Sequence, residues 1–232
     1  MKDYKKEGEI KGSLELDGNL TLTGDLKVED WIEVKGYIDC AGYSIKAGDF
    51  IEAGGFIKAG GFIEAGDSIE AGYSIEAGDS IKAGYSIEAG YFIKAGGFIE
   101  AGYFIKAGGS IKAGYSIKAG DFIEAGGSIE AGDSIEAGGS IKAGYSYGIK
   151  ASLGITAKSY ISCGLNIYAG ICEWKEANDE DKTVTCSELR KGNVEYGILR
   201  ELGIDETVTI KISKKSLEAL KDSGIEIINP KK

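Results

Sequence analysis

An isoleucine recurs at every sixth position from Ile45 to Ile141 without a slip. Each six-residue unit reads Gly, then Tyr, Asp or Gly, then Ser or Phe, then Ile, then Glu or Lys, and ends with Ala. A period of six fits no single helix, and similarity at a fixed period is typical of a solenoid. In an extended segment Ile and Ala lie on one side, and the residues between and before them lie on the other. We expect the glycine to bend the chain, because glycine adopts positive φ without steric cost.

Strands joined by bends, with isoleucine always inward, predict a mainly β fold, a triangular single-stranded β-solenoid. Three units per turn would give coils of about 18 residues, stacked at the strand spacing of about 4.8 Å. The pattern continues on both sides of the regular section, so the solenoid is predicted over residues 12–171, with eight to nine coils. Extra residues interrupt the period near Gly42 or Tyr43 and again at "YSYG". Cys40 and Cys163 fall on inward positions of the predicted core.

The period is lost in residues 172–232, which predict a small α+β segment. The polar stretch 172–182 predicts a loop, and residues 205–213 alternate as a strand does. Residues 213–224 start with serine and end with glycine, as a short helix would, and residues 225–228 predict another strand. Because the open end of a solenoid is an unpaired sheet edge, we expect this segment to cap the last coil; an added binding role is the alternative.

The composition argues against catalysis. The chain has no histidine, which removes the commonest general base at neutral pH and the commonest metal ligand. Its four cysteines show no metal-ligand spacing. We therefore predict no catalytic residue, no metal and no cofactor; an enzyme would need carboxylates such as Glu173 or Glu176, which no motif groups. No apolar run could span a membrane and the N-terminus lacks the apolar core of a signal peptide, so we expect a cytoplasmic protein without membrane attachment.

The outward charges separate into faces when they are sorted by coils of 18 residues. On one face Lys and Glu alternate from Lys46 to Glu136, which predicts a ladder of ion pairs between coils. A second face is acidic, with Lys106 and Lys142 as its cations in the regular section. Its candidate partner-binding residues are Asp49, Glu52, Asp67, Glu70, Glu88, Asp121 and Glu124.

The acidic face has two interpretations. It is either a solvated face that keeps the protein soluble, or a strip that docks on a basic surface of a protein partner, including a surface that normally holds nucleic acid. A basic face is absent, so we do not expect the solenoid itself to bind DNA or RNA.

All seven phenylalanines occupy the outward position before an isoleucine. Six of them form two runs in consecutive units, so that each run would ring one coil. These candidate partner-binding residues are Phe50, Phe56 and Phe62, then Phe92, Phe98 and Phe104. Exposed phenylalanine lowers solubility unless it is covered. Either tyrosines of adjacent turns cover these rings, or the rings contact a partner or a second copy of the chain.

Units of the form G-x-S-I-K-A resemble those of bactofilins, bacterial proteins whose triangular β-helices polymerise end to end. The resemblance covers about residues 12–170 and implies a self-assembling scaffold, although a structured segment of about 60 residues at one end departs from it. The period is also similar to that of hexapeptide acyltransferases, but this chain lacks their catalytic histidine.

These observations favour a non-catalytic, rod-shaped binding protein with an acidic, aromatic-ringed surface. One concrete version is a phage-encoded inhibitor of a nucleic-acid-handling or defence complex, since acidic β-helices of the pentapeptide-repeat class, which this chain resembles in general character, act in this way. The alternative is a bactofilin-like scaffold.

Overall fold

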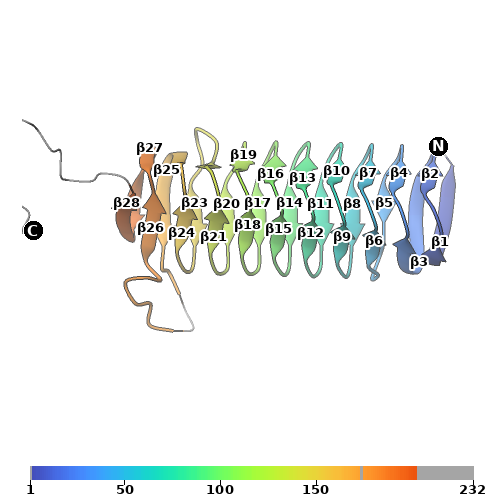
Figure 1. Ribbon diagram of the computed structural model, residues 1–232, viewed down its shortest axis with the longest axis horizontal. Helices are drawn as coiled ribbons and strands as arrows, with labels where there is room; N and C mark the ends of the chain where they lie inside the picture. Colours follow the sequence, from blue (N-terminus) through green and yellow to red (C-terminus); the bar gives the residue numbers. More distant parts are fainter. Residues whose placement is uncertain (1, 173–174, 203–232) are drawn as a thin grey trace, which may run out of the picture. The chain divides into compact units, whose positions relative to one another are not determined.

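The structure is a computed structural model that describes residues 2–172 and 175–202. These residues form 28 strands joined by turns, and every strand pair is parallel. Strands that are 18 residues apart along the chain lie side by side, as Ile81 and Ile99 do. The chain therefore winds as a β-solenoid of about eleven turns (Figure 1). This confirms the predicted fold class, with more coils than the eight to nine expected.

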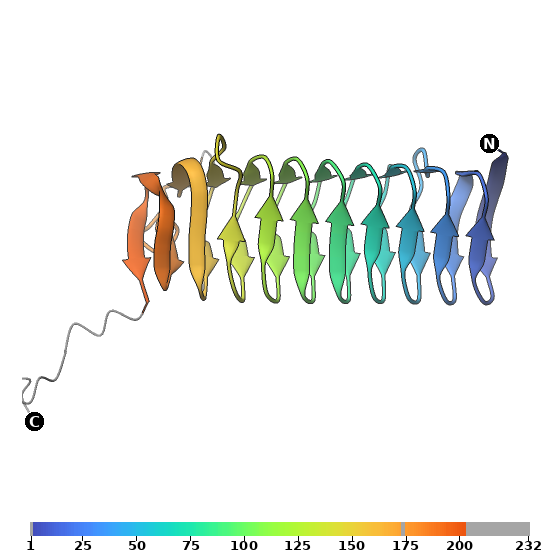
Figure 2. The same cartoon turned by 90° about the horizontal axis from the view of Figure 1, so that it is seen from above.

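The strands stack in three columns, which make the three faces of a prism (Figure 2). We call these the paired, glutamate and mixed faces. The paired face contains the second half of β3 (Asn19–Val28), β6 (Ile45–Ala47), β9 (Ile63–Ala65), β12 (Ile81–Ala83), β15 (Ile99–Ala101), β18 (Ile117–Ala119), β21 (Ile135–Ala137), β24 (Ile155–Ala157), β26 (Thr183–Cys186) and β28 (Ile198–Glu201).

The other two faces follow the same order along the chain. The glutamate face contains β2 (Leu14–Leu16), β4 (Ile32–Val34), β7 (Ile51–Ala53), β10 (Ile69–Ala71), β13 (Ser86–Ala89), β16 (Phe104–Ala107), β19 (Ile123–Ala125), β22 (Ile141–Lys142) and the first halves of β25 (Tyr160–Ala169) and β27 (Glu188–Tyr196). The mixed face contains the first half of β3, β5 (Ile38–Asp39), β8 (Ile57–Ala59), β11 (Ile75–Ala77), β14 (Ile93–Ala95), β17 (Ile111–Ala113), β20 (Ile129–Ala131), β23 (Ile149–Ala151) and the second halves of β25 and β27.

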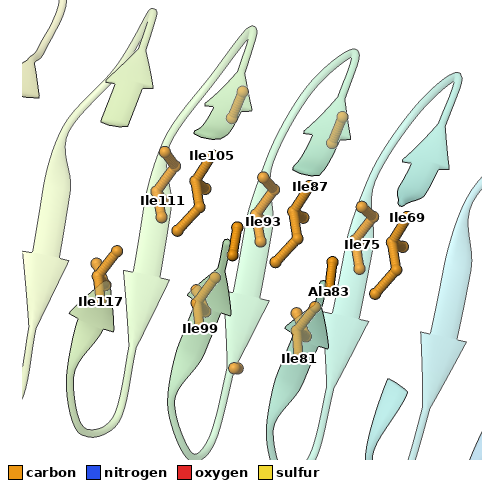
Figure 3. Packing of buried hydrophobic residues seen from close by; sticks show 14 of the residues in the cluster. Ile69, Ile75, Ile81, Ala83, Ile87, Ile93, Ile99, Ile105, Ile111 and Ile117 are labelled. Carbon is orange, nitrogen blue, oxygen red and sulfur yellow. The ribbon is translucent and has the colours of Figure 1, made fainter. Parts of the chain in front are cut away.

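The interior is filled by the isoleucines and alanines of the repeat, as predicted. From Ile45 to Ile167 every repeat isoleucine is fully buried, and the inward alanines are buried beside them. Figure 3 shows isoleucines from all three faces, such as Ile87, Ile93 and Ile99, directed into one common core. Cys40 and Cys163 lie in this core, also as predicted. The interior is a packed column of side chains that fixes the coils on one another.

The repeat glycines have a different role from the one expected. None of the glycines from Gly48 to Gly144 has a positive φ, so the predicted reason for their presence is wrong. A Cβ added to Gly66 would instead overlap the carbonyl oxygen of Gly48 in the coil before, and a Cβ on Gly84 would overlap that of Gly66. Glycine is therefore required because the coils stack backbone to backbone at the corners.

The extra residues in the repeat lie at corners, and they leave the strand register intact. Ala41 takes a positive φ of 48° where the first extra residue lies, and Tyr43 N–H bonds to the Cys40 carbonyl oxygen. At the second interruption, Tyr147 N–H closes a similar turn by donating to the Gly144 carbonyl oxygen. Beyond each turn the isoleucines resume their pairing, as Ile38 with Ile57 and Ile129 with Ile149. Both irregularities were predicted from the sequence.

The coils extend beyond residues 12–171 at both ends. Strand β1 (Asp3–Ile10) pairs with β3, and β26 to β28 pair in parallel with β24 to β26. Residues 175–182 form the predicted loop between β25 and β26, and the described residues contain no helix. The strands expected at 205–213 and 225–228 and the helix expected at 213–224 lie outside the described residues.

Candidate interaction surface

On the paired face, opposite charges neutralise one another between coils. The strand register places Lys46 beside Glu64 and Lys82 beside Glu100. Nζ of Lys46 lies 2.6 Å from Oε1 of Glu64, and the Lys82–Glu100 and Lys118–Glu136 pairs are at 3.7 and 3.8 Å. This confirms the predicted ladder. Each pair is exposed to solvent, so its contribution is small, roughly 0.2–1 kcal/mol.

On the glutamate face, five glutamates follow one another in register without a cation between them. They stand at the outward position of five consecutive strands: Glu15, Glu33, Glu52, Glu70 and Glu88. Adjacent backbones are about 4.8 Å apart in such a stack, and like charges placed directly opposite destabilise a sheet. Among the described residues, the first four of these glutamates join no ion pair. We call this set the glutamate ladder.

The middle of the ladder responds to this crowding. The pKa of Glu52 is raised above its ordinary value, first by partial burial and then by the charges of Glu70 and Glu33. Burial and like charge both disfavour the ionised carboxylate. Ionisation of Glu52 is therefore less favourable in the folded chain than in the unfolded chain.

Aspartates line the corner that leads from the paired face to the glutamate face. Asp49 N–H bonds to the carbonyl oxygen of Asp30, and Asp67 N–H bonds to that of Asp49. The three residues are thus stacked in consecutive coils beside Glu33, Glu52 and Glu70. Asp49, Glu52, Asp67 and Glu70, four of the predicted residues, lie together in two adjacent coils.

The remaining predicted carboxylates stand in different surroundings. Lys106 Nζ lies 2.8 Å from Oε1 of Glu88, and Lys142 Nζ lies 2.7 Å from Oε1 of Glu124. The carboxylate of Asp121 raises the pKa of Tyr103, which occupies the same corner one coil before it. Glu88 and Glu124 are thus neutralised by lysines, whereas Asp121 joins no ion pair among the described residues. The run of carboxylates without a cation between them lies in the N-terminal half.

The sequence reasoning missed Glu15, Glu33 and Asp30 as members of this surface. The extra residue near Tyr43 shifts the spacing between Glu33 and Glu52 to 19, which hides their common column. The signal was present, because Ile32 and Val34 flank Glu33 as Ile51 and Ala53 flank Glu52.

The phenylalanines of each run occupy the three corners of one coil, as predicted. Phe50 stacks on Trp31 at 5.4 Å between ring centroids, and Phe56 stacks on Tyr37 at 4.8 Å. Tyr91 meets Phe92 edge-on, and Phe104 lies against Tyr85 and Tyr103. Phe62 and Phe98 remain 39% and 47% exposed. Neighbouring aromatic rings therefore cover some of these phenylalanines and leave the corner with Phe62 and Phe98 open.

The described part of the surface has no grouping of residues that points to a metal site. No set of three or more His, Cys, Asp or Glu in the described ranges could hold a metal ion. Cys40, Cys163 and Cys186 are buried, and burial raises the pKa of the Cys40 thiol to about 12. Glu176 is exposed in the loop before β26, and Glu173 lies outside the described residues.

Comparison with family models, with curated proteins and with solved structures finds no match for this chain. Within residues 2–172 and 175–202, no helix is long and apolar enough to cross a bilayer. Inference about function therefore depends on the surface itself.

Proposed function

We propose that the protein is a non-catalytic, cytoplasmic binding protein that docks the N-terminal half of its glutamate face on a basic surface of a protein partner. The observation that carries the proposal is the glutamate ladder. The paired face shows that the same coils accept alternating Lys and Glu at the equivalent positions. A like-charged ladder lowers stability where an alternating one would not, so it is best explained by a partner that neutralises it.

The charge density of this strip supports a role as a mimic of nucleic acid. Three consecutive coils each present one corner aspartate and one glutamate, namely Asp30 with Glu33, Asp49 with Glu52, and Asp67 with Glu70. Two charges per coil of about 4.8 Å give roughly one charge per 2.4 Å, against about one per 1.7 Å along duplex DNA. A rigid strip of this density would compete for a groove that holds nucleic acid, as an inhibitor of a nucleic-acid-handling or defence complex would.

The test is a pull-down from bacterial lysate with the full chain, followed by mass spectrometry. One variant reverses Asp49, Glu52, Asp67 and Glu70 to lysine. The control reverses Glu64, Glu100 and Glu136 of the paired face together with Glu9 of β1, which pairs with Lys27 of that face, and so makes the same change in net charge. We expect the first variant alone to lose its captured partner, and added duplex DNA to release that partner from the unmodified protein. Unchanged capture would show that the acidic strip is not the docking surface, and equal loss in both variants would show that only net charge matters.

End-to-end assembly of the bactofilin kind is the second candidate. The exposed apolar side chains of Ile198, Leu199 and Leu202 at the last described strand favour it. At the other end, β1 carries Lys5 and Lys6 and a register shift between Lys6 and Gly8, features that hinder edge-to-edge pairing. Light scattering over a range of concentrations separates the two candidates, because filaments grow with concentration and a binding protein of fixed size does not.

A further inference from the structure

Six consecutive strands of the paired face carry a charge series that is its own complement when it is reversed. Their outward residues are, coil by coil, Lys46, Glu64, Lys82, Glu100, Lys118 and Glu136. Read from the other end, the series has a glutamate wherever the first reading has a lysine. A second copy lying antiparallel on this face, in full overlap, would set every lysine opposite a glutamate. A parallel copy related by a two-fold axis would instead set like charges opposite one another.

The corner that leads from the mixed face into the paired face carries large and small side chains in the same six coils. The residue before each inward isoleucine is, in order, Ser44, Phe62, Ser80, Phe98, Ser116 and Ser134. A two-fold axis that makes the rods antiparallel brings this same corner of both copies together. The coil of Phe62 then lies opposite that of Ser116, and the coil of Phe98 lies opposite that of Ser80. A large side chain therefore always meets a small one, and no two phenylalanines collide.

The paired face has a hollow that can accept one of these rings. A cavity of about 250 Å³ lies beside Phe98 and is lined by Phe98, Ile99, Glu100, Ser116 and Lys118. It belongs to the coil that would face Phe62 of a second copy. Phe62 and Phe98 are both exposed, and neither stacks on another ring among the described residues. Because exposed apolar patches mark contact sites, these two rings are the apolar anchors of the face.

The corner between the paired and glutamate faces adds a further aromatic contact. Tyr85 and Tyr103, which are both exposed, follow one another in adjacent coils there. In the antiparallel arrangement Tyr85 of one copy lies opposite Tyr103 of the other. Asp67 lies opposite Asp121, a like-charged contact at the rim, where solvent screens the charges and the cost is small.

We propose that the protein forms an antiparallel two-fold dimer through its paired face. Phe62 of each copy enters the hollow beside Ser116 of the other. Phe98 of each copy covers Ser80 of the other. Each outward lysine of the face keeps its glutamate in the neighbouring coil and gains a second glutamate across the interface.

This dimer is distinct from both functions considered above. The six coils span about 29 Å, which is short for a stable interface, so the dimer dissociates on dilution. A closed two-fold arrangement stops at two copies, unlike end-to-end assembly. It leaves the glutamate face of each copy uncovered, so the inference is independent of the proposed docking function, which needs only one copy.

Sedimentation of the full chain over a range of concentrations measures the dimer, and a charge rescue tests its geometry. Lys46→Glu would face Glu136 of the second copy, and Glu136→Lys would face Lys46. Each single variant should weaken the dimer roughly tenfold, because the two-fold axis repeats the repulsive contact. The double variant restores opposite charges across the interface and should recover the dimer. Within one chain the two residues are five coils, or about 24 Å, apart, so rescue between them can come only from a second copy.

The matched charge control is Glu130→Lys, which breaks a similar ion pair, with Lys112, on the mixed face and should leave the dimer unchanged. Phe62→Ser removes the ring that enters the hollow, and Ser116→Phe fills the hollow, so both should weaken the dimer. Phe56→Ser is their control, because Phe56 stacks on Tyr37 at the corner remote from the paired face.

Four results would each overturn the proposal. They are a monomer at every concentration, growth beyond two copies, a double variant as weak as the single ones, and equal loss of the dimer in the control variants.

Discussion

The paired face and the glutamate face are built on the same coils, with the same inward isoleucines and alanines and the same register. They differ in the single outward residue of each strand, which alternates in sign from Lys46 to Glu136 on one face and is glutamate five times in succession on the other. The fold tolerates both arrangements, so the core does not dictate the charge pattern. We propose that the charge pattern of the glutamate face serves the docking of a basic partner and not the folding of the core.

Core truncation should have the largest effect, and it should be equal on the two faces. Ile69 lies behind the glutamate ladder and Ile81 behind the ion pairs, and both are fully buried. Replacing either by alanine should lower the free energy of unfolding by about 2–5 kcal/mol, because it leaves a cavity in the same column. Denaturant unfolding followed by circular dichroism measures both. A clear difference between them would mean that the two faces do not share one core.

Charge substitutions should have smaller effects of opposite sign on the two faces. Glu70→Lys places a cation between Glu52 and Glu88, so it should stabilise the fold by roughly 0.2–1 kcal/mol for each neighbour. Glu64→Lys on the paired face breaks the contact with Lys46 and puts three cations in a row, so it should destabilise by a similar amount. The two melting temperatures provide the measurement. Shifts in the same direction would show that net charge, and not the ladder, governs stability.

The pH dependence should distinguish the same two faces. Because the pKa of Glu52 is raised in the folded state, the folded chain binds a proton more readily than the unfolded chain as the pH falls toward the ordinary glutamate range. Glu52→Gln should therefore be more stable than the unmodified protein at pH 7, and this advantage should shrink as the pH approaches about 4.5.

Glu9, on the paired side, gives the control for this titration. Its pKa is lowered by the hydrogen bond and charge of Lys27, so its contribution to stability is present at neutral pH and lost on acidification. Glu9→Gln should therefore be less stable than the unmodified protein at pH 7, with the deficit shrinking as the pH falls. A Glu52→Gln advantage that does not change with pH would contradict the ladder repulsion.

Salt should produce the smallest effect. The Debye length falls from about 10 Å at 0.1 M to about 3 Å at 1 M salt, so exposed charges in adjacent coils interact less. The stabilisation by Glu70→Lys and the destabilisation by Glu64→Lys should both diminish, and the two melting temperatures should converge. A gap that persists at 1 M salt would point to packing of the lysine stems as its cause.

The regular coils could be predicted from the sequence because each six-residue unit states its inward and outward residues. The terminal coils could not be predicted, because β1 contributes only Tyr4 and Ile10 to the core and β27 pairs with β25 through three register shifts. The reason for the glycines was also hidden, because it depends on the carbonyl group of the neighbouring coil. The sequence of one unit shows which of its residues lie inward and outward, whereas contacts with neighbouring coils are defined only by the folded stack.

The candidate surface was predictable to the extent that charges repeat at the coil spacing. Asp49, Glu52, Asp67 and Glu70 were recognised as neighbours, while Glu33 was not, because one extra residue separates its coil from the next. For the Ser74 hydroxyl, which has no hydrogen-bond partner among the described residues, the one sequence signal is Tyr73, which stands where Asp79 precedes Ser80. The difference arises from the side chain at the adjacent turn, whose reach only the folded chain defines.

The three-sided coil also limits how a gene for such a protein can change in length. Loss or gain of a single six-residue unit would leave the core pattern intact, yet every later unit would move to the next face of the prism. If the change fell between Glu33 and β7, for example, the glutamates of β7 and β10 would no longer share a column with Glu33. Slippage within the repetitive coding sequence is therefore harmless to the surface only when it adds or removes whole coils, and such events would lengthen or shorten the rod while keeping each face in line.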